Sequence, residues 1–210
     1  MGLLRLLFSD PAAFVILSVL LLYSVIFHEL AHGWVAYRMG DGTAKWLGRL
    51  TLNPIKHLDI IGTLMLLVFG FGWAKPVPIN LENIPPEKRR KGLIFVSAAG
   101  ITVNIIIAFI ALLLLRLLAP ESGSMTHQII DLLARINIIL AAFNLIPIPP
   151  LDGSKILMAL APESVTRILD QIEPFGFFII IGLLYLGVLD PLINLFQYII
   201  LALISVFLPG

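Results

Sequence analysis

The sequence of 210 residues contains no cysteine. This absence excludes a disulfide framework, a zinc site built from thiolates and a cysteine nucleophile. Any metal ion must therefore be held by histidine, aspartate or glutamate side chains.

Charged residues are also scarce, because Asp, Glu, Lys and Arg make up 13% of the chain whereas apolar residues make up 59%. The mean hydropathy is +1.01. So few charges cannot cover the surface of a water-soluble domain of this length. A formal net charge of +1 also provides no basic surface, so no nucleic-acid partner is expected.

The chain contains several long runs of apolar residues instead. A bilayer core about 30 Å thick is crossed by about 20 apolar residues in a helix. We predict helices over residues 11–38, 92–118 and 126–151, and one or two spans within 174–208. The sequence therefore predicts an all-α polytopic membrane protein with about four to six transmembrane helices, forming a single integral-membrane domain over residues 1–210.

The polar part of the chain, residues 43–91, is predicted to form basic loops. Within it, residues 60–74 are too short to span the bilayer and carry basic residues on both flanks, which favours a re-entrant segment that returns to the cytoplasmic side. Short extended or β segments are expected beside it, near the active site. Residues 154–173 alternate apolar and charged side chains, as an amphipathic helix on the membrane surface does.

The first predicted span contains His28-Glu29-Leu30-Ala31-His32, an H-E-x-x-H pattern. Residues four apart share a helix face, so both imidazoles can bind one metal ion while Glu29 handles a water molecule beside it. Ionisable side chains inside a span are unfavourable without a partner, and a metal ion is such a partner. The alternative is a proton relay or a hydrogen-bonded polar seam between helices.

Two imidazoles do not complete a catalytic zinc site, which normally has three protein ligands and one open position. Asp152 is the candidate third ligand, because it follows the proline-rich end of the run 126–151. Counting crossings from the basic loops brings that end to the same cytoplasmic side as the end of the first span. The alternative role for Asp152 is to cap the helix that begins near Ser154.

Several motifs together resemble the site-2 protease group of intramembrane zinc metalloproteases, peptidase family M50, in a short form without a PDZ or CBS domain. The motifs are Phe27 to His32, Gly48 to Asp59, Gly72 to Asn80 and Asn144 to Gly153. The resemblance implies Zn²⁺ held by His28, His32 and Asp152, with Glu29 as general base. Ile60 and Ile101 stand where the family usually has proline, which we expect to alter backbone bends and not the chemistry.

The resemblance implies an endopeptidase that hydrolyses peptide bonds in or near transmembrane segments of single-span or helical membrane-protein substrates. We expect a multi-pass protein of a prokaryotic plasma membrane, with the active site toward the cytoplasm. Asn144 and Asn104 are candidates for binding the substrate or the oxyanion, and an interhelical hydrogen bond is the alternative for each. Two other functions stay open, namely a membrane metal or proton transporter and a non-catalytic zinc-binding membrane scaffold, and the oligomeric state is not predicted.

Overall fold

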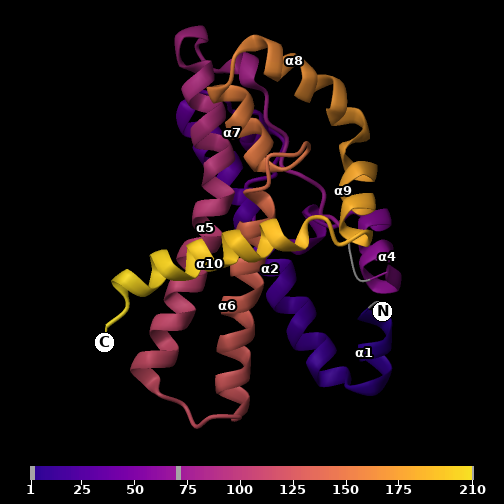
Figure 1. The fold of residues 1–210 in the computed structure, drawn as a ribbon, viewed down its shortest axis with the longest axis vertical. Coiled ribbons are helices and arrows are strands. Elements are labelled where there is room, and N and C mark those ends of the chain that lie inside the picture. The colour runs from indigo at the N-terminus through magenta and orange to yellow at the C-terminus, as the bar shows by residue number, and fades with distance from the viewer. Residues whose placement is uncertain (1–2, 70–71, 210) are drawn as a thin grey trace.

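The structure, a computed structural model, describes residues 3–69 and 72–209, and within these ranges it is helical and contains no strand (Figure 1). Its elements are α1 (Leu3–Ser9), α2 (Pro11–Met39), α3 (Thr43–Trp46), η1 (Pro54–Lys56), α4 (Ile60–Phe69), η2 (Leu81–Asn83), η3 (Pro86–Lys88), α5 (Arg89–Leu118), α6 (Met125–Asn144), α7 (Asp152–Leu160), α8 (Glu163–Ile172), η4 (Glu173–Phe175), α9 (Gly176–Tyr185) and α10 (Asp190–Phe207).

The long helix α2 has clear start and stop signals. The Asp10 side chain accepts the backbone N–H of Ala13 at 3.0 Å, and Pro11 occupies the first turn, where a missing N–H is harmless. The helix ends at Gly40, whose φ of 118° lies in the left-handed region that favours glycine. Between these ends the side chains are largely apolar, so the two histidines and Glu29 are carried into an apolar environment.

Helix α5 is the centre of the fold, because it packs against both α2 and α6 (Figure 1). Small residues line these contacts, and Ala108 and Ala111 of α5 and Ala141 and Ala142 of α6 are fully buried. Small side chains let helix backbones approach closely in lipid, where packing drives association more than the hydrophobic effect does. This close packing fixes the faces of α2, α5 and α6 that carry polar residues.

Five helical stretches among the described residues are long and apolar enough to cross a membrane. They are Pro11–Met39, Pro86–Leu118, Met125–Asn144, Glu163–Tyr185 and Asp190–Phe207. Many large apolar side chains on them are exposed, as expected of surfaces that face lipid. The prediction of an all-α polytopic membrane protein is confirmed.

Two predicted helices have different bounds in the structure. The run 126–151 is helical only as far as Asn144, and the proline-rich residues 145–151 leave the helix before α7 begins at Asp152. The predicted surface helix over 154–173 is divided into α7 and α8 at Ala161-Pro162, because proline cannot continue a helix from the residue before it.

The predicted re-entrant segment 60–74 begins with a short helix, and its two flanks lie together. Its first part is α4, about 15 Å long, which is half the thickness of the bilayer core. The backbone N–H of Lys75 donates to the carbonyl of His57 at 2.8 Å, so the two flanks of the segment meet. Residues 70 and 71 of the predicted re-entrant segment lie outside the described residues. The flanking segments predicted to be extended form no strand among the described residues, so β pairing was not found there.

The C-terminal helices close the molecule. Helices α8 and α9 descend beside the bundle, and α10 lies across α6 and α5 instead of alongside them (Figure 1). Ile200 and Ile204 of α10 are buried against Ile101, Ala108 and Ile138. Helix α10 thus covers one face of the α5–α6 pair.

Candidate metal centre

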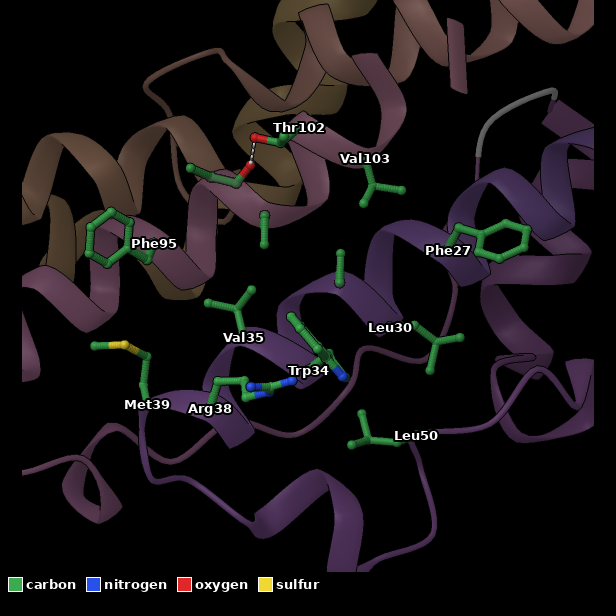
Figure 2. Close-up of a pocket in the computed structure, with 13 residues that line it drawn as sticks. Phe27, Leu30, Trp34, Val35, Arg38, Met39, Leu50, Phe95, Thr102 and Val103 are labelled. Carbon is green, nitrogen blue, oxygen red and sulfur yellow. Dashed lines mark hydrogen bonds between the residues drawn. The ribbon is translucent and has the colours of Figure 1, made fainter. Parts of the chain in front are cut away.

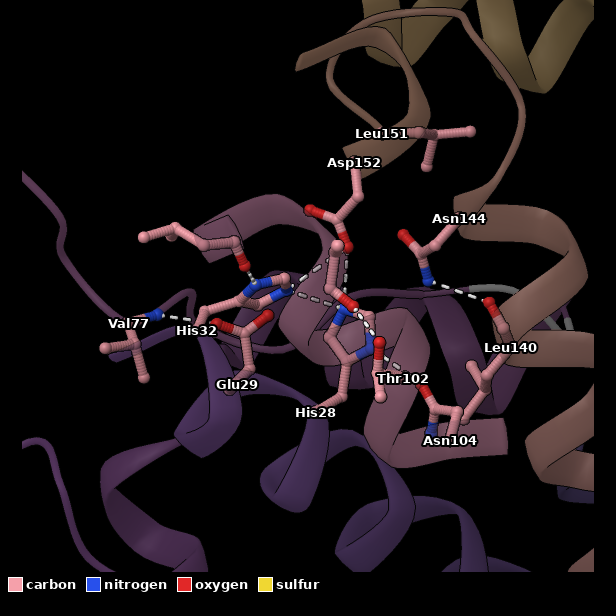
Figure 3. A network of polar contacts seen from close by, with 12 residues as sticks. His28, Glu29, His32, Val77, Thr102, Asn104, Leu140, Asn144, Leu151 and Asp152 are labelled. Carbon is pink, nitrogen blue, oxygen red and sulfur yellow. Dashed lines mark hydrogen bonds and ion pairs between the residues drawn. The ribbon is translucent and has the colours of Figure 1, made fainter. Parts of the chain in front are cut away.

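Three buried side chains from two distant parts of the chain converge on one point (Figure 3). The Nε2 atoms of His28 and His32 each lie 3.2 Å from Oδ2 of Asp152, and the two Nε2 atoms lie 2.9 Å apart. Each of the three residues is at most 7% exposed. Helix α2 presents the imidazoles from adjacent turns, and the first residue of α7 presents the carboxylate.

The opposite nitrogen of each imidazole is held by an acceptor. His28 Nδ1 lies 2.6 Å from Oδ1 of Asn104, and His32 Nδ1 lies 2.6 Å from the carbonyl oxygen of Val96. Because an amide oxygen and a carbonyl oxygen only accept, each Nδ1 carries the hydrogen and donates it. The Nε2 lone pairs are then directed at the common point, which is the usual arrangement of histidine ligands to a metal.

The electrostatics of this point favour a bound cation. Oδ2 of Asp152 is buried and has no hydrogen-bond partner among the described side chains. Leu151, and not Asp152, precedes the first turn of α7, and no side chain caps that helix. A buried carboxylate oxygen facing two imidazole lone pairs is repelled by them unless a positive ion lies between. The donor set, one carboxylate and two neutral imidazoles, suits zinc.

Gly100 of α5 forms the wall of the site. A Cβ atom on this residue would lie 2.4 Å from Nε2 of His32 and 2.5 Å from Cε1 of His28. Both distances are shorter than van der Waals contact, and the imidazoles are already fixed by their Nδ1 bonds. Only glycine therefore leaves the rings where they are.

Glu29 lies beside the convergent point, on the next residue of the same helix turn. Its Oε2 accepts the backbone N–H of Val77 at 2.7 Å, and the side chain is half-buried (Figure 3). A carboxylate held by one oxygen keeps the other available. The structure thus places the residue predicted as general base next to the predicted ligands.

Asn104, one of the two predicted substrate-binding amides, is fully buried behind His28. Its Nδ2 donates to Oδ1 of Asn137 at 2.8 Å, and Nδ2 of Asn137 donates to Oγ of Ser24 at 2.9 Å. Both ends of Asn104 are therefore engaged by protein groups. This interhelical network corresponds to the alternative reading of Asn104.

Asn144, the other predicted amide, ends α6 and is half-buried near Asp152 (Figure 3). Its Nδ2 donates to the carbonyl of Leu140 at 3.0 Å, and no hydrogen bond involves its Oδ1 among the described residues. One side of the amide therefore remains available.

Sequence reasoning assigned no role at the metal centre to several residues that the structure places there. Ser24 and Asn137 are polar residues within apolar helices, a signal that could have found them. Val96 and Val77 contribute through backbone atoms, and Gly100 contributes by lacking a side chain, so residue type gives no signal for any of the three. Helix packing alone reveals them.

A separate groove of about 860 Å³ lies between α2 and α5 (Figure 2). Its lining is apolar apart from Arg38 and Thr102, and includes Phe27, Trp34 and Phe95. None of His28, Glu29, His32 and Asp152 lines it, so the groove lacks the groups that a hydrolytic site needs. The chemistry belongs to the buried polar cluster.

Known proteins are similar to this chain in sequence. The sequence model described as Peptidase family M50 matches residues 117–186, which include Asp152. The "Putative zinc metalloprotease YwhC" of Bacillus subtilis (strain 168) is 43% identical to the chain over 200 residues, which cover 90% of each protein. The chain belongs to peptidase family M50. Other relatives of this M50 chain are more distant. The protein of the same description from Methanocaldococcus jannaschii, MJ0611, is 33% identical over 158 residues, which cover 71% of the chain and 75% of that relative.

A second archaeal relative, "Zinc metalloprotease MJ0392" of the same organism, is 27% identical over 190 residues, which cover 87% of the chain and 47% of the relative. No solved structure matches the M50 chain significantly. The resemblance that the motifs indicated is therefore confirmed at the level of the family.

Proposed function

We propose that the chain is a zinc metalloprotease that cleaves membrane-protein substrates in or near their transmembrane segments. The observation that carries this proposal is the convergence of His28, His32 and Asp152 on one buried point, with Glu29 on the adjacent turn. Membership of family M50 and the names of the relatives support the zinc and the peptidase chemistry.

Zinc is the cofactor of this chemistry, and His28, His32 and Asp152 are the residues that would hold it. When bound, zinc polarises a carbonyl group and lowers the pKa of water. Burial of the three ligands excludes bulk water and strengthens every electrostatic interaction in the site.

Glu29 acts as general base in this proposal. Its free carboxylate oxygen accepts a proton from the attacking water molecule and later passes it to the leaving amine. The bond from Val77 to the other oxygen keeps the carboxylate in one orientation. We propose Asn144 as a substrate contact through its unengaged amide oxygen, whereas Asn104 holds the His28 ring.

The substrate is proposed to be a single-span or otherwise helical membrane protein. The two histidine ligands lie on a helix long and apolar enough to cross a bilayer, which supports a substrate that reaches them from lipid. The basic loops favour a cytoplasmic position for this end of the molecule. We propose a prokaryotic plasma membrane, since the relative from Bacillus subtilis covers 90% of the chain.

The deciding experiment uses purified protein in which bound zinc is counted and cleavage of a panel of single-span substrates is measured. Glu29→Gln keeps the size and the acceptor oxygen of the side chain but removes the base. We expect this variant to bind zinc as the wild type does and to lose about 10²- to 10⁴-fold in kcat.

Equal turnover by wild type and Glu29→Gln would overturn the protease proposal and favour a zinc-binding scaffold. Flux of metal ions or protons in liposomes, without cleavage, would favour a transporter. A chelator control should abolish cleavage, and added zinc should restore it.

A further inference from the structure

The segment Lys75–Asn83, here called the strap, passes next to the Glu29 side chain. The backbone N–H of Val77, the third residue of the strap, donates to Oε2 of Glu29 at 2.7 Å (Figure 3). Val77 is only 5% exposed and the Glu29 side chain is half-buried, so the donor end of this bond is shielded from water. The orientation of the carboxylate therefore depends on where the strap lies.

Arg49 anchors the first part of the strap. Its Nη2 donates to the carbonyl oxygens of Lys75 at 2.8 Å and Pro76 at 3.1 Å, directly before Val77. Arg49 is 9% exposed and makes no ion pair among the described residues. Because this buried guanidinium bonds to backbone carbonyls and to no described carboxylate, its role is to hold the backbone of the strap in place.

Asp41 anchors the last part of the strap. Its Oδ2 accepts the backbone N–H of Asn80 at 2.6 Å, and its Oδ1 accepts Nδ2 of Asn83 at 2.8 Å. Asp41 is fully buried and follows the end of α2 by two residues. Val77 is thus held between two anchors, of which one belongs to the turn that ends the helix carrying Glu29.

Gly33 provides the space in which Val77 packs. It lies four residues after Glu29 and therefore on the same face of α2. A Cβ atom on Gly33 would lie 2.8 Å from Cγ1 of Val77 and 2.6 Å from Cδ2 of Leu50. A valine side chain is stiff at χ1, so a larger residue at position 33 would move the Val77 backbone away from Glu29.

We propose that the strap is the device that orients the general base, and that Arg49, Asp41 and Gly33 are positioning residues acting on Glu29 through the Val77 N–H. The role as base rests on the proposed function, whereas the contact itself does not. The strap fixes one carboxylate oxygen and leaves the other facing the site. Loss of an anchor therefore lowers kcat without removing a zinc ligand.

The contact is tested without any substrate, by hydrogen exchange of the Val77 amide in the full-length zinc-loaded protein. Glu29→Ala removes the acceptor, so exchange of this amide should become about 10-fold faster or more. Glu29→Gln retains an acceptor oxygen and should preserve most of the protection. Equal exchange in wild type and Glu29→Ala would overturn the proposal, whether or not the protein proves to be a protease.

The positioning role is tested by Arg49→Gln, with Arg90→Gln as matched control. Arg90 also donates to two backbone carbonyls, those of Ala159 and Leu160, but it holds the last turn of α7 and not the strap. We expect Arg49→Gln to lower kcat about 10- to 100-fold with KM and zinc content near wild type. Arg49→Lys, which can bond to one carbonyl, should restore part of the loss.

Faster exchange at Val77 should accompany the loss of kcat in Arg49→Gln and be absent in Arg90→Gln. If Arg49→Gln and Arg90→Gln lost kcat equally, or if KM rose while kcat stayed constant, the strap would not position the base. A wild type that exchanges as expected but cleaves nothing would remove the proposed function and leave the contact standing.

Discussion

At the scale of residues, the geometry of the site depends on the groups that hydrogen-bond to the two histidine ligands. The chain of bonds from Ser24 through Asn137 and Asn104 to His28 joins α2, α6 and α5. Asn104 and Asn137 are both fully buried, so an unsatisfied amide would cost about 1–3 kcal/mol. The satisfied network fixes the plane of one imidazole, and the Val96 carbonyl fixes the other.

Gly100 provides a test of this rigid arrangement. In Gly100→Ala the new methyl group would meet both imidazoles, which cannot move without losing their Nδ1 bonds. We expect zinc affinity to fall about 10- to 100-fold, as it does when the support of a metal ligand is disturbed. Zinc titration of the purified protein measures this change.

The control is Gly182→Ala in α9, where a Cβ atom would meet no atom within 4 Å. This variant should bind zinc as tightly as wild type. A similar loss in both variants, or in neither, would show that Gly100 is not required for the geometry of the ligands.

At the scale of elements, the polar loops between α2 and α5 are held together by Asp41. Burial raises the pKa of the Asp41 carboxyl, but hydrogen bonds from Thr43, Asn83 and Asn80 outweigh burial, so the pKa lies below its ordinary value. Its hydroxyl partner, Thr43, bonds to it at 2.5 Å. The ionised form is therefore the one that stabilises the loops.

A lowered pKa predicts how stability depends on pH. A carboxyl with a lower pKa in the folded state stabilises the fold above its unfolded pKa of about 4, and this contribution is lost as the pH falls through the folded pKa. Asp41→Asn replaces an acceptor by an N–H₂ group that faces other donors. We expect it to lower the melting temperature by a constant amount from pH 7 to about pH 5, and by less below about pH 4.

Thermal unfolding in detergent at several pH values measures this difference. The exposed Asp170 of α8 offers a control, since Asp170→Asn should change the melting temperature little at any of these pH values. A difference for Asp41→Asn that grew toward acid pH would contradict the assigned direction of the pKa.

At the scale of the whole molecule, the start of α5 lies at one end of the α5–α6 pair and the connection between α5 and α6 lies at the other (Figure 1). The metal centre contacts α5 at Val96, Gly100 and Asn104, between its start and its middle, and therefore lies on the side of the basic loops. With the basic loops on the cytoplasmic side, the α5–α6 connection is expected outside.

The absence of cysteine makes this orientation directly measurable. Single cysteines at two exposed positions, Ser122→Cys in the α5–α6 connection and Glu87→Cys before α5, should react differently with a membrane-impermeant maleimide added to intact cells. We expect labelling at position 122 and none at position 87 until the membrane is permeabilised. The reverse pattern would place the metal centre on the outer side.

Much of the architecture could be predicted because lipid imposes strong rules on sequence. Apolar length predicts spans, and basic loops predict sides, so the helices over 11–38 and 92–118 were located within a few residues. The limits of the third long helix were less accurate, because apolar residues continue past Asn144 while the backbone does not remain helical. The division of 154–173 at Pro162 was missed because the charge pattern continues across the break.

The sequence by itself determined that the protein lies in a membrane, because its charged residues are few and its apolar runs are long. It also determined the candidate metal ligands, because cysteine is absent and a spacing of four residues places His28 and His32 on one helix face. Only the tertiary structure decided that Asp152 lies beside the two histidines, that the Asn104 side chain accepts the Nδ1 hydrogen of His28, and that the Val77 N–H donates to Glu29. These contacts join residues far apart in the chain and use backbone atoms or the absence of a side chain. Residue types and local periodicity do not predict such contacts, because the packing of α2, α5 and α6 creates them.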